Sequence, residues 1–392
     1  MRTNRSWLCI FGAAFYCFAN APLYAEDGVF KDRILFGQVA ALNGPAQALG
    51  QGMREGILAA FEEANRAGGI GGRKLELKSI DDSYEPEKTI EATDRAIKED
   101  KVFALVGAVG TPTSKAGQPI ATAAKVPFIG PFTGAEFLRN PFNRYVVNIR
   151  SSYFQETEAW IEHLTTDLGI TRIAILYQDD AFGLAGLAGV KKAMDKRNMA
   201  LVAEGTFKRN TTAIKSALLD IMKGQPQAVV TVGPYKPIAE FIKLARQLKV
   251  DAAFVAISFV GSDSLAQELG NQGAGVIISQ VVPFPGDKSL PVVASYQSAL
   301  AALNPKSKPG FVSLEGYLVG QLVVQTLKRI PGDPSREAFL DAVEGGPFDL
   351  GGVKLEFSAS KNQGSNQVYF TVLASDGSFR PVTKFVKTVA KQ

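Results

Sequence analysis

Residues 102–116 read VFALVGAVGTPTSKA, and residues 227–241 read QAVVTVGPYKPIAEF. Each stretch is an apolar run followed by a glycine turn, a proline close to a helix start and then a helical pattern. This order is typical of a buried strand that leads through a tight turn into a helix. Two such copies indicate a chain with two similar halves, each built from strand–helix units.

The turn in the first copy, GAVGTPTS at 107–114, is a candidate anion site. Thr111 is a suitable N-cap and Pro112 suits the first helical position, so free N–H groups and the helix dipole favour a small anion such as a carboxylate. A nucleotide is disfavoured, because Lys115 comes after the threonine–serine pair and Thr113 replaces the third glycine of the dinucleotide pattern. A plain helix cap without a ligand is the alternative.

Apolar runs and helical periods alternate from Ile34 to Val282. Strands that alternate with helices indicate parallel sheets covered by helices on both faces. The series is too long for one sheet, so it predicts an α/β protein with two doubly wound parallel-sheet lobes. We expect strands at 34–39, 74–82, 102–110, 126–132, 145–149, 172–178, 200–207, 228–233, 252–258 and 275–282, and helices at 53–64, 86–99, from 112, 154–168, 183–197, 213–223, 236–248, 262–269, 291–303, 311–330 and 335–344.

Prolines 283, 285 and 291 mark a crossing between the lobes, and the strand-like tail carries an Asp-Gly turn at 376–377. Because the tail returns to both lobes, several connections form a hinge. We expect one lobe at 26–149 with 283–347, and the other at 150–282 with 348–392. Ligands of open parallel sheets lie beyond the carboxyl ends of the strands, which puts GAVGTPTS at the lip of a cleft.

The first 25 residues have the pattern of a secretory signal peptide. Arg2 and Arg5 precede an apolar core at 7–19, and a small residue, Ala25, stands before the acidic start of the mature chain. The apolar core is too short to span a bilayer. We therefore expect cleavage after Ala25 and a soluble product in the periplasm.

The composition excludes several classes of site. Cys9 and Cys17 both lie in the leader and neither sits in a lipobox, so the mature chain has no disulfide, thiol nucleophile or lipid anchor. The apolar fraction of 46% is that of an ordinary globular protein. Removal of the two leader arginines lowers the net charge by two, from +5 to +3, and this mild excess does not indicate nucleic acid.

Residues for catalysis or metal binding are scarce. His163 is the one histidine, on a partly exposed helix face, and the chain lacks a nucleophile elbow. Acid pairs follow two strands, in IDDSYEPE at 80–87 and YQDDAFG at 177–183, where they favour helix capping over catalysis. The sequence predicts no cofactor and no metal. A two-lobed exported protein with a hinge and no catalytic set is expected to bind and release a ligand.

The chain resembles the type I periplasmic solute-binding proteins of branched-chain amino-acid ABC transporters, the leucine/isoleucine/valine-binding group. The resemblance covers nearly all of the mature chain in the same order. The pieces that carry it are ALNGPAQALGQGMREGILAAFEEANRAGGIGGRKLEL, DDSYEPEKT, FALVGAVGTPTSKA, VPFIGPFTGAEFLRNP, AILYQDDAFG, VGPYKPIAEF and GVIISQVVP.

The resemblance implies which residues hold a ligand. In the first lobe Thr111 supplies a hydroxyl to the ligand carboxylate, the PFTG segment supplies Phe132, Thr133 and Gly134, and Leu49 packs on the side chain. In the second lobe Phe182 and Tyr235 close over the ligand. The implied activity is capture of a small carboxylate, favoured to be an apolar amino acid, for an inner-membrane ABC permease, by a protein expected to be a monomer.

One departure from the family pattern bears on the ligand. Where amino-acid binders of this group place a glutamate for the α-ammonium, this chain has Ser258 followed by Phe259. Either Asp82, Asp180 or Glu315 takes that role, or the ligand is an aromatic or aliphatic carboxylic acid or amide without an ammonium. A ligand sensor of the same fold, and an enzyme that uses Asp179 or Asp180, are further alternatives.

Overall fold

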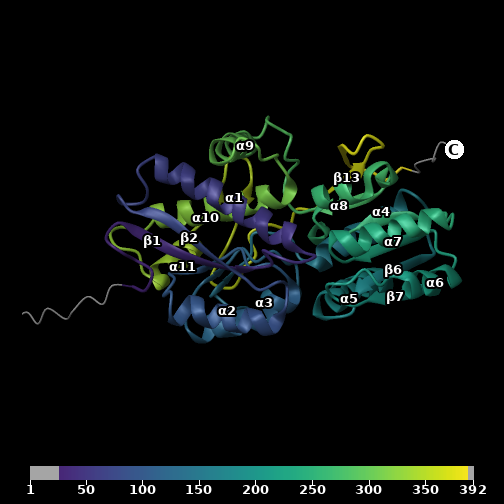
Figure 1. Cartoon of the computed structure of the whole chain (residues 1–392), viewed down its shortest axis with the longest axis horizontal. Helices are drawn as coiled ribbons and strands as arrows, with labels where there is room; N and C mark the ends of the chain where they lie inside the picture. Colours follow the sequence, from purple (N-terminus) through teal and green to yellow (C-terminus); the bar gives the residue numbers. More distant parts are fainter. Residues whose placement is uncertain (1–25, 387–392) are drawn as a thin grey trace, which may run out of the picture.

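The computed structural model describes residues 26–386, which form two lobes side by side (Figure 1). The signal peptide and both cysteines predicted from the sequence lie outside the described residues. The first lobe is built on a parallel sheet of five strands in the order β2-β1-β3-β4-β5. These strands are β1 (Arg33–Ala40), β2 (Lys74–Asp81), β3 (Leu105–Val106), β4 (Phe128–Ile129) and β5 (Val146–Val147).

Helices cover both faces of the first sheet (Figure 1). On one face α1 packs against α9 and α10, and on the other α2 packs against α3. Proline occupies the first turn of α2, α3 and α9, where its missing N–H leaves no hydrogen bond unmade. The helices of this lobe are α1 (Gln47–Arg66), α2 (Pro86–Lys98), α3 (Thr111–Ala123), α9 (Pro291–Leu303), α10 (Phe311–Lys328) and α11 (Arg336–Glu344).

The second lobe has a sheet of seven strands in the order β14-β13-β10-β9-β8-β6-β7. Five strands are parallel, and the C-terminal hairpin adds β13 and β14 antiparallel at one edge. Its strands are β6 (Ile173–Gln178), β7 (Ala203–Phe207), β8 (Ala228–Val232), β9 (Ala253–Ala256), β10 (Ile277–Gln280), β13 (Tyr369–Leu373) and β14 (Phe379–Val382), and its helices are α4 (Tyr153–Thr166), α5 (Ala181–Asp195), α6 (Lys215–Lys223), α7 (Tyr235–Gln247) and α8 (Ser262–Leu269).

Short polar side chains start two helices of the second lobe. Ser152 forms a capping box with Gln155 at the start of α4. Asp180 accepts a hydrogen bond from the Phe182 amide at the start of α5. Such caps satisfy backbone donors that have no partner in the first helical turn, so the sequence itself defines these boundaries.

The contact between α1 and α10 depends on glycine. A β-carbon at Gly56 would lie 1.9 Å from the Ser313 carbonyl oxygen, and one at Gly316 would lie 2.3 Å from the Met53 carbonyl oxygen. The two helix backbones therefore touch directly. Nearly all of α10 is buried in this packing, including its acidic residue Glu315.

Three segments cross between the lobes. The chain leaves β5 through 148–151, returns after β10 through 281–283, and crosses again at 363–367. The first and third run side by side, since Asn148 pairs with Gln363 and the Ser151 hydroxyl donates to the Gln367 carbonyl. All three segments line one cavity on the hinge.

The small antiparallel pair β11 (Phe348–Asp349) and β12 (Lys354–Leu355) precedes the last crossing. The guanidinium of Arg329 stacks on the Phe348 ring at 3.5 Å, and the Val292 amide donates to the Gly351 carbonyl. Residues 348–351, which the sequence assigns to the second lobe, thus contact segments assigned to the first.

The two lobes and their parallel sheets confirm the α/β fold predicted from the sequence. One local detail differs, because the N-cap of α3 is Gly110 and not Thr111. Gly110 has a φ of 108°, which lets the chain turn so sharply that Thr111 is already helical. No helix within residues 26–386 is long and apolar enough to cross a membrane.

Candidate ligand-binding site

The nine residues predicted to bind a ligand all lie between the lobes, close to the carboxyl ends of parallel strands. The strand order reverses between β1 and β3 in the first sheet and between β6 and β8 in the second, and open α/β folds place their ligands beyond the carboxyl ends at such reversals. All nine are buried. Leu49, Thr111, Phe132, Thr133 and Gly134 follow β1, β3 and β4, while Phe182, Tyr235, Ser258 and Phe259 follow β6, β8 and β9.

Two threonine hydroxyls meet at the start of α3. Thr111 Oγ1 and Thr133 Oγ1 are 2.7 Å apart, and both side chains are buried. The Thr133 hydroxyl also accepts a hydrogen bond of 3.3 Å from the Ala135 amide. Gly134 follows directly, and its carbonyl accepts a hydrogen bond of 2.7 Å from the Tyr153 amide in the second lobe.

Aromatic rings from both lobes gather around Phe259. Its ring centre lies 4.5 Å from Phe182 in its own lobe, and 5.3 Å from Phe132 and 6.1 Å from Tyr84 in the first lobe. Phe259 belongs to a short 3₁₀ turn, Ser258–Val260, that follows β9. The predicted site is therefore walled mainly by apolar surface.

Leu49 and Tyr235 form a separate contact between the lobes. The hydroxyl of Tyr235 accepts a long hydrogen bond of 3.5 Å from the Ala48 amide. A β-carbon at Gly261 would lie 2.5 Å from Leu49 Cδ2, so only glycine lets the leucine pack against that turn. Both residues thus take part in closing the lobes.

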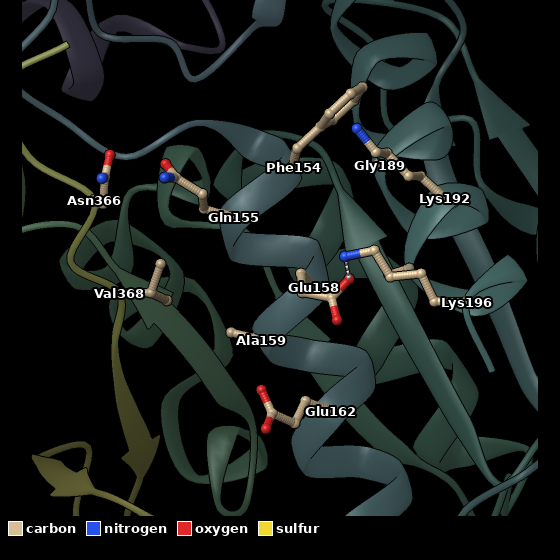
Figure 2. A pocket seen from close by; sticks show the side chains of 11 residues that line it. Phe154, Gln155, Glu158, Ala159, Glu162, Gly189, Lys192, Lys196, Asn366 and Val368 are labelled. Atoms are coloured by element: carbon tan, nitrogen blue, oxygen red, sulfur yellow. Dashed lines mark hydrogen bonds and ion pairs between the residues drawn. The ribbon is translucent and has the colours of Figure 1, made fainter.

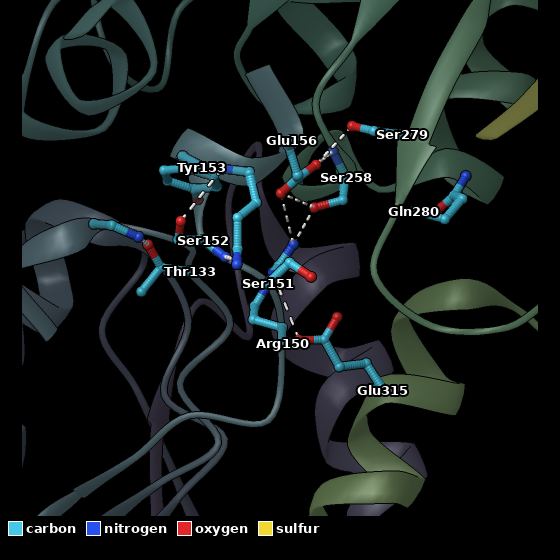
Figure 3. Close-up of polar contacts among 12 residues, drawn as sticks. Thr133, Arg150, Ser151, Ser152, Tyr153, Glu156, Ser258, Ser279, Gln280 and Glu315 are labelled. Carbon is cyan, nitrogen blue, oxygen red and sulfur yellow. Dashed lines mark hydrogen bonds and ion pairs between the residues drawn. The ribbon is translucent and has the colours of Figure 1, made fainter. Parts of the chain in front are cut away.

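A buried charge cluster lies beside the aromatic residues (Figure 3). Arg150, on the first crossing segment, donates from Nη2 to the Ser258 hydroxyl, and its guanidinium lies 4.8 Å from the Phe132 ring centre. Two carboxylates flank it, Glu156 from α4 and Glu315 from α10, each 3.6 Å from a guanidinium nitrogen.

The two carboxylates are hydrogen-bonded to different degrees. Glu156 accepts from the Ser258 amide at 3.0 Å, the Ser258 hydroxyl at 2.9 Å and the Ser279 hydroxyl at 2.6 Å. Glu315 Oε1 has no hydrogen bond within residues 26–386. Burial raises the pKa of Glu315 to about 7, although the charge of Arg150 opposes the rise.

The other two acids predicted as ammonium partners are engaged in local structure. Asp82 accepts from the Tyr84 amide and the Thr89 hydroxyl, and burial raises its pKa to about 6. Asp180 caps α5 and also accepts from the Arg209 guanidinium at 3.0 Å. Of the three acids, only Glu315 is paired with Arg150.

Polar contacts also join the lobes at the rim. Arg209 donates to Glu85 at 2.8 Å as well as to Asp180, and so bridges the two lobes. The amide of Gln178 donates to the Tyr84 hydroxyl at 3.2 Å. The acid pairs that follow β2 and β6 thus cap turns and link the lobes.

His163 lies on α4, where it contacts the C-terminal segment. The imidazole stacks on Phe385 with ring centres 4.9 Å apart and pairs with Asp167 at 2.7 Å. Within the described part of the chain, no three histidine, cysteine or acidic side chains gather as they would around a metal ion. His163 therefore helps to hold the C-terminal segment on α4.

A cavity of about 400 Å³ opens on the second lobe, between α4 and α5 (Figure 2). Among its charged side chains, Lys196 pairs with Glu158 at 2.9 Å, and Lys192 lies over the Phe154 ring. None of the nine predicted residues lines it. This cavity is distinct from the cleft between the lobes.

The sequence did not single out Arg150, Tyr153 and Glu156, which the structure places at the cleft. Arg150 and Tyr153 flank the Ser151–Ser152 start of α4, and Glu156 lies one turn into that helix. The available signal was a charged residue at the end of the apolar run YVVNIR, on the segment that leaves the first lobe.

Comparisons with known proteins agree with this architecture. A family model described as periplasmic binding protein matches residues 33–378. A possible leucine/isoleucine/valine-binding protein from Rhodopirellula baltica SH 1 is 37% identical, with a TM-score of 0.87 over 92% of this chain and 98% of that one. An extracellular ligand-binding receptor from Verminephrobacter eiseniae is 30% identical, with a TM-score of 0.82 over 89% and 99%.

A curated relative shows the same likeness in sequence. The Leu/Ile/Val-binding protein BraC3 of Rhizobium johnstonii is 27% identical over 84% of this chain and 86% of its own length. The names of these relatives are those of solute-binding proteins and not of enzymes. The chain belongs to the periplasmic binding protein family, in its type I group of leucine/isoleucine/valine-binding proteins.

Proposed function

We propose that this protein captures a small carboxylate with an apolar side chain in the periplasm and delivers it to an inner-membrane ABC permease. The observation that carries the proposal is the Thr111–Thr133 hydroxyl pair at the start of α3, next to the aromatic cluster around Phe259. Hydroxyls and free helix N–H groups suit a carboxylate, and the rings suit an apolar body.

The ligand would bind as the lobes close. Phe132 and Phe182 reach Phe259 from opposite lobes, so a ligand among them is held only when the lobes meet. Two-lobed binding proteins with several hinge strands close by small changes in those connections. Closure of this kind captures a ligand without transforming it.

Two ligand classes are candidates. The names of the relatives favour an apolar amino acid. The site favours a carboxylic acid without an ammonium, because Ser258 stands where the resemblance predicts an acid. The Ser258 hydroxyl accepts a hydrogen bond from the cationic Arg150. A buried ammonium next to a guanidinium is unfavourable, because like charges repel strongly away from water.

Export of the chain is part of the proposal. Cleavage after Ala25 would leave a mature protein that begins at Glu26, the first described residue. Mass analysis of protein recovered from the periplasm checks this directly. A mature mass that includes Met1 would contradict the proposed location.

The function is tested with protein unfolded and refolded to remove any bound ligand. Thermal-shift screening against amino acids, their deaminated acids and aromatic acids should find ligands among carboxylates with apolar side chains. Calorimetry then gives the dissociation constants. Failure of every carboxylate to bind a folded protein would refute the proposal.

A further inference from the structure

Three buried donors at the cleft make no hydrogen bond of normal geometry within residues 26–386, although Arg150 Nη1 lies 3.6 Å from Glu315 Oε1. They are Nε and Nη1 of Arg150 and the hydroxyl of Tyr153. Arg150 is 1% exposed and Tyr153 is fully buried. Buried donors are nearly always well hydrogen-bonded in proteins, so a group of three without a hydrogen bond of normal geometry indicates a place where another molecule supplies an acceptor.

These donors lie next to the proposed carboxylate site. The guanidinium of Arg150 packs on Phe132, which directly precedes Thr133. Burial raises the pKa of Tyr153, while the charge of Arg150 and hydrogen bonding with the Thr133 and Thr111 hydroxyls oppose the rise, so the phenol lies beside the threonine pair and close to Arg150. The cleft therefore holds two neighbouring sets of donors, the threonine pair and the Arg150–Tyr153 set.

We propose that Arg150 and Tyr153 bind a second oxygen acceptor of the ligand, next to its carboxylate, and that the ligands are 2-oxo acids with an apolar side chain. The inference rests on the proposed function, since it assumes a carboxylate held by Thr111 and Thr133. The 2-oxo oxygen accepts from the guanidinium and the phenol, and the apolar chain packs among the aromatic rings.

The charges around Arg150 select a neutral second acceptor. Glu156 and Glu315 already lie 3.6 Å from its guanidinium, so a ligand with a second carboxylate would bring a third carboxyl group to one cation. An ammonium is disfavoured by the guanidinium itself. Glu156 is a poor partner for a ligand ammonium, because its oxygens already accept three hydrogen bonds from Ser258 and Ser279.

Two matched series of ligands test the inference by calorimetry. The first is 4-methyl-2-oxopentanoate, 4-methylpentanoate and leucine, and the second is phenylpyruvate, 3-phenylpropanoate and phenylalanine. Within each series only the group next to the carboxylate changes. In the series that fits the pocket, we expect the 2-oxo acid to bind at least tenfold more tightly than either companion.

Tyr153→Phe is the sharpest variant, because it removes only the hydroxyl and keeps the buried ring, so it should leave folding intact. We expect it to weaken the 2-oxo acid by about fivefold or more relative to the deaminated acid. Tyr296→Phe is the control, since that buried hydroxyl bonds only within the first lobe, to Gly310 and Ser313. Arg150→Lys, which keeps the charge, should weaken the 2-oxo acid more than the deaminated acid.

Other outcomes would overturn the inference. Equal affinity for the 2-oxo and deaminated acids would show that no second acceptor is recognised. Tight binding of leucine or phenylalanine that is lost in Glu315→Gln would identify Glu315 as an ammonium partner. The proposed function as a carboxylate carrier would then hold, and the proposal of 2-oxo acid ligands would be wrong. If neither series binds, the inference fails, and the wider carboxylate screen then decides the proposed function separately.

Discussion

Thr111 starts a helix and also belongs to the proposed ligand site. It is the first residue of α3, and its hydroxyl contacts Thr133 and not the backbone of its own helix. If the pair holds a carboxylate, Thr111→Val removes a charge-assisted hydrogen bond that contributes about 1.5–3 kcal/mol. Calorimetry should show a dissociation constant roughly ten to a hundred times larger.

A matched threonine separates binding from folding in that experiment. Thr326 is also buried in a helix, and its hydroxyl donates to the Leu322 carbonyl at 2.7 Å, within α10. Thr326→Val should therefore change stability without changing affinity. If Thr111→Val binds the ligand as tightly as the unaltered protein, Thr111 has only a structural role at the start of α3.

Glu315 should make the stability of the protein depend on pH. Its pKa is about 7 in the folded protein, mainly because it is buried, and the ordinary value is 4.5. Between these values the folded state binds more protons than the unfolded state, so the free energy of unfolding falls as pH rises. This contribution is fully present below about pH 4.5 and is lost as pH passes 7.

Glu315→Gln should remove that dependence. Relative to the unaltered protein, the variant should gain stability as pH rises from 5 to 8, by on the order of 3 kcal/mol at most. Urea unfolding at intervals of one pH unit measures this difference, with the exposed Glu240→Gln in α7 as the control. A difference that is the same at every pH would show that Glu315 stays ionised.

At the scale of elements, the direct contact of α1 with α10 sets where Glu315 lies. An added methyl at Gly56 would meet the backbone of α10, at 1.9 Å from the Ser313 carbonyl oxygen. Backbone cannot move aside as a side chain can. We expect Gly56→Ala to destabilise the protein by about 1–3 kcal/mol in urea unfolding, despite the better helix propensity of alanine.

Gly52, one turn earlier in α1, provides the comparison. A β-carbon there would lie 3.0 Å from Val312 Cγ1, a side-chain atom that can move slightly. Both substitutions gain the same helix propensity, so the difference between them isolates the backbone contact. Equal stabilities for Gly52→Ala and Gly56→Ala would show that the helices can separate at little cost.

At the scale of the whole molecule, the rim contacts govern how the lobes close. Arg209 bridges Glu85 and Asp180, and its side chain is 21% exposed. A partly exposed ion pair of this kind contributes about 1 kcal/mol or less, because solvent screens it. Arg209→Gln should therefore weaken ligand binding by a few fold, and small-angle scattering should show a more open ligand-free protein.

Arg197 is a matched control for the rim contact. It pairs with Glu158 at 2.9 Å within the second lobe, and its side chain is 23% exposed. Arg197→Gln loses a comparable ion pair without touching the first lobe, so neither affinity nor the radius of gyration should change. An equal loss of affinity in both variants would indicate a general effect of charge.

The sequence by itself determined the elements and the loops that carry the site. Hydrophobic periodicity is local, and it predicted both parallel sheets and the helices between them. Most ends fell within four residues, but α1 begins six residues before the predicted 53–64. Because parallel strands share a carboxyl edge, the loops after β3, β4, β8 and β9 had to face the same cleft. The strand-end rule placed Thr111 at the cleft, and the resemblance to the family added Phe132, although the capping role belonged to Gly110.

Only the tertiary structure decided the burial of Arg150 and its partners. Charged residues are rarely buried unless they are paired, and nothing near Arg150 in the sequence shows that Ser258 and Glu315 lie against it. These partners come from elements more than a hundred residues away, brought together by the hinge and by the glycine contact of α1 with α10. Burial of a charge costs free energy that only such distant partners offset, so local pattern could not reveal it.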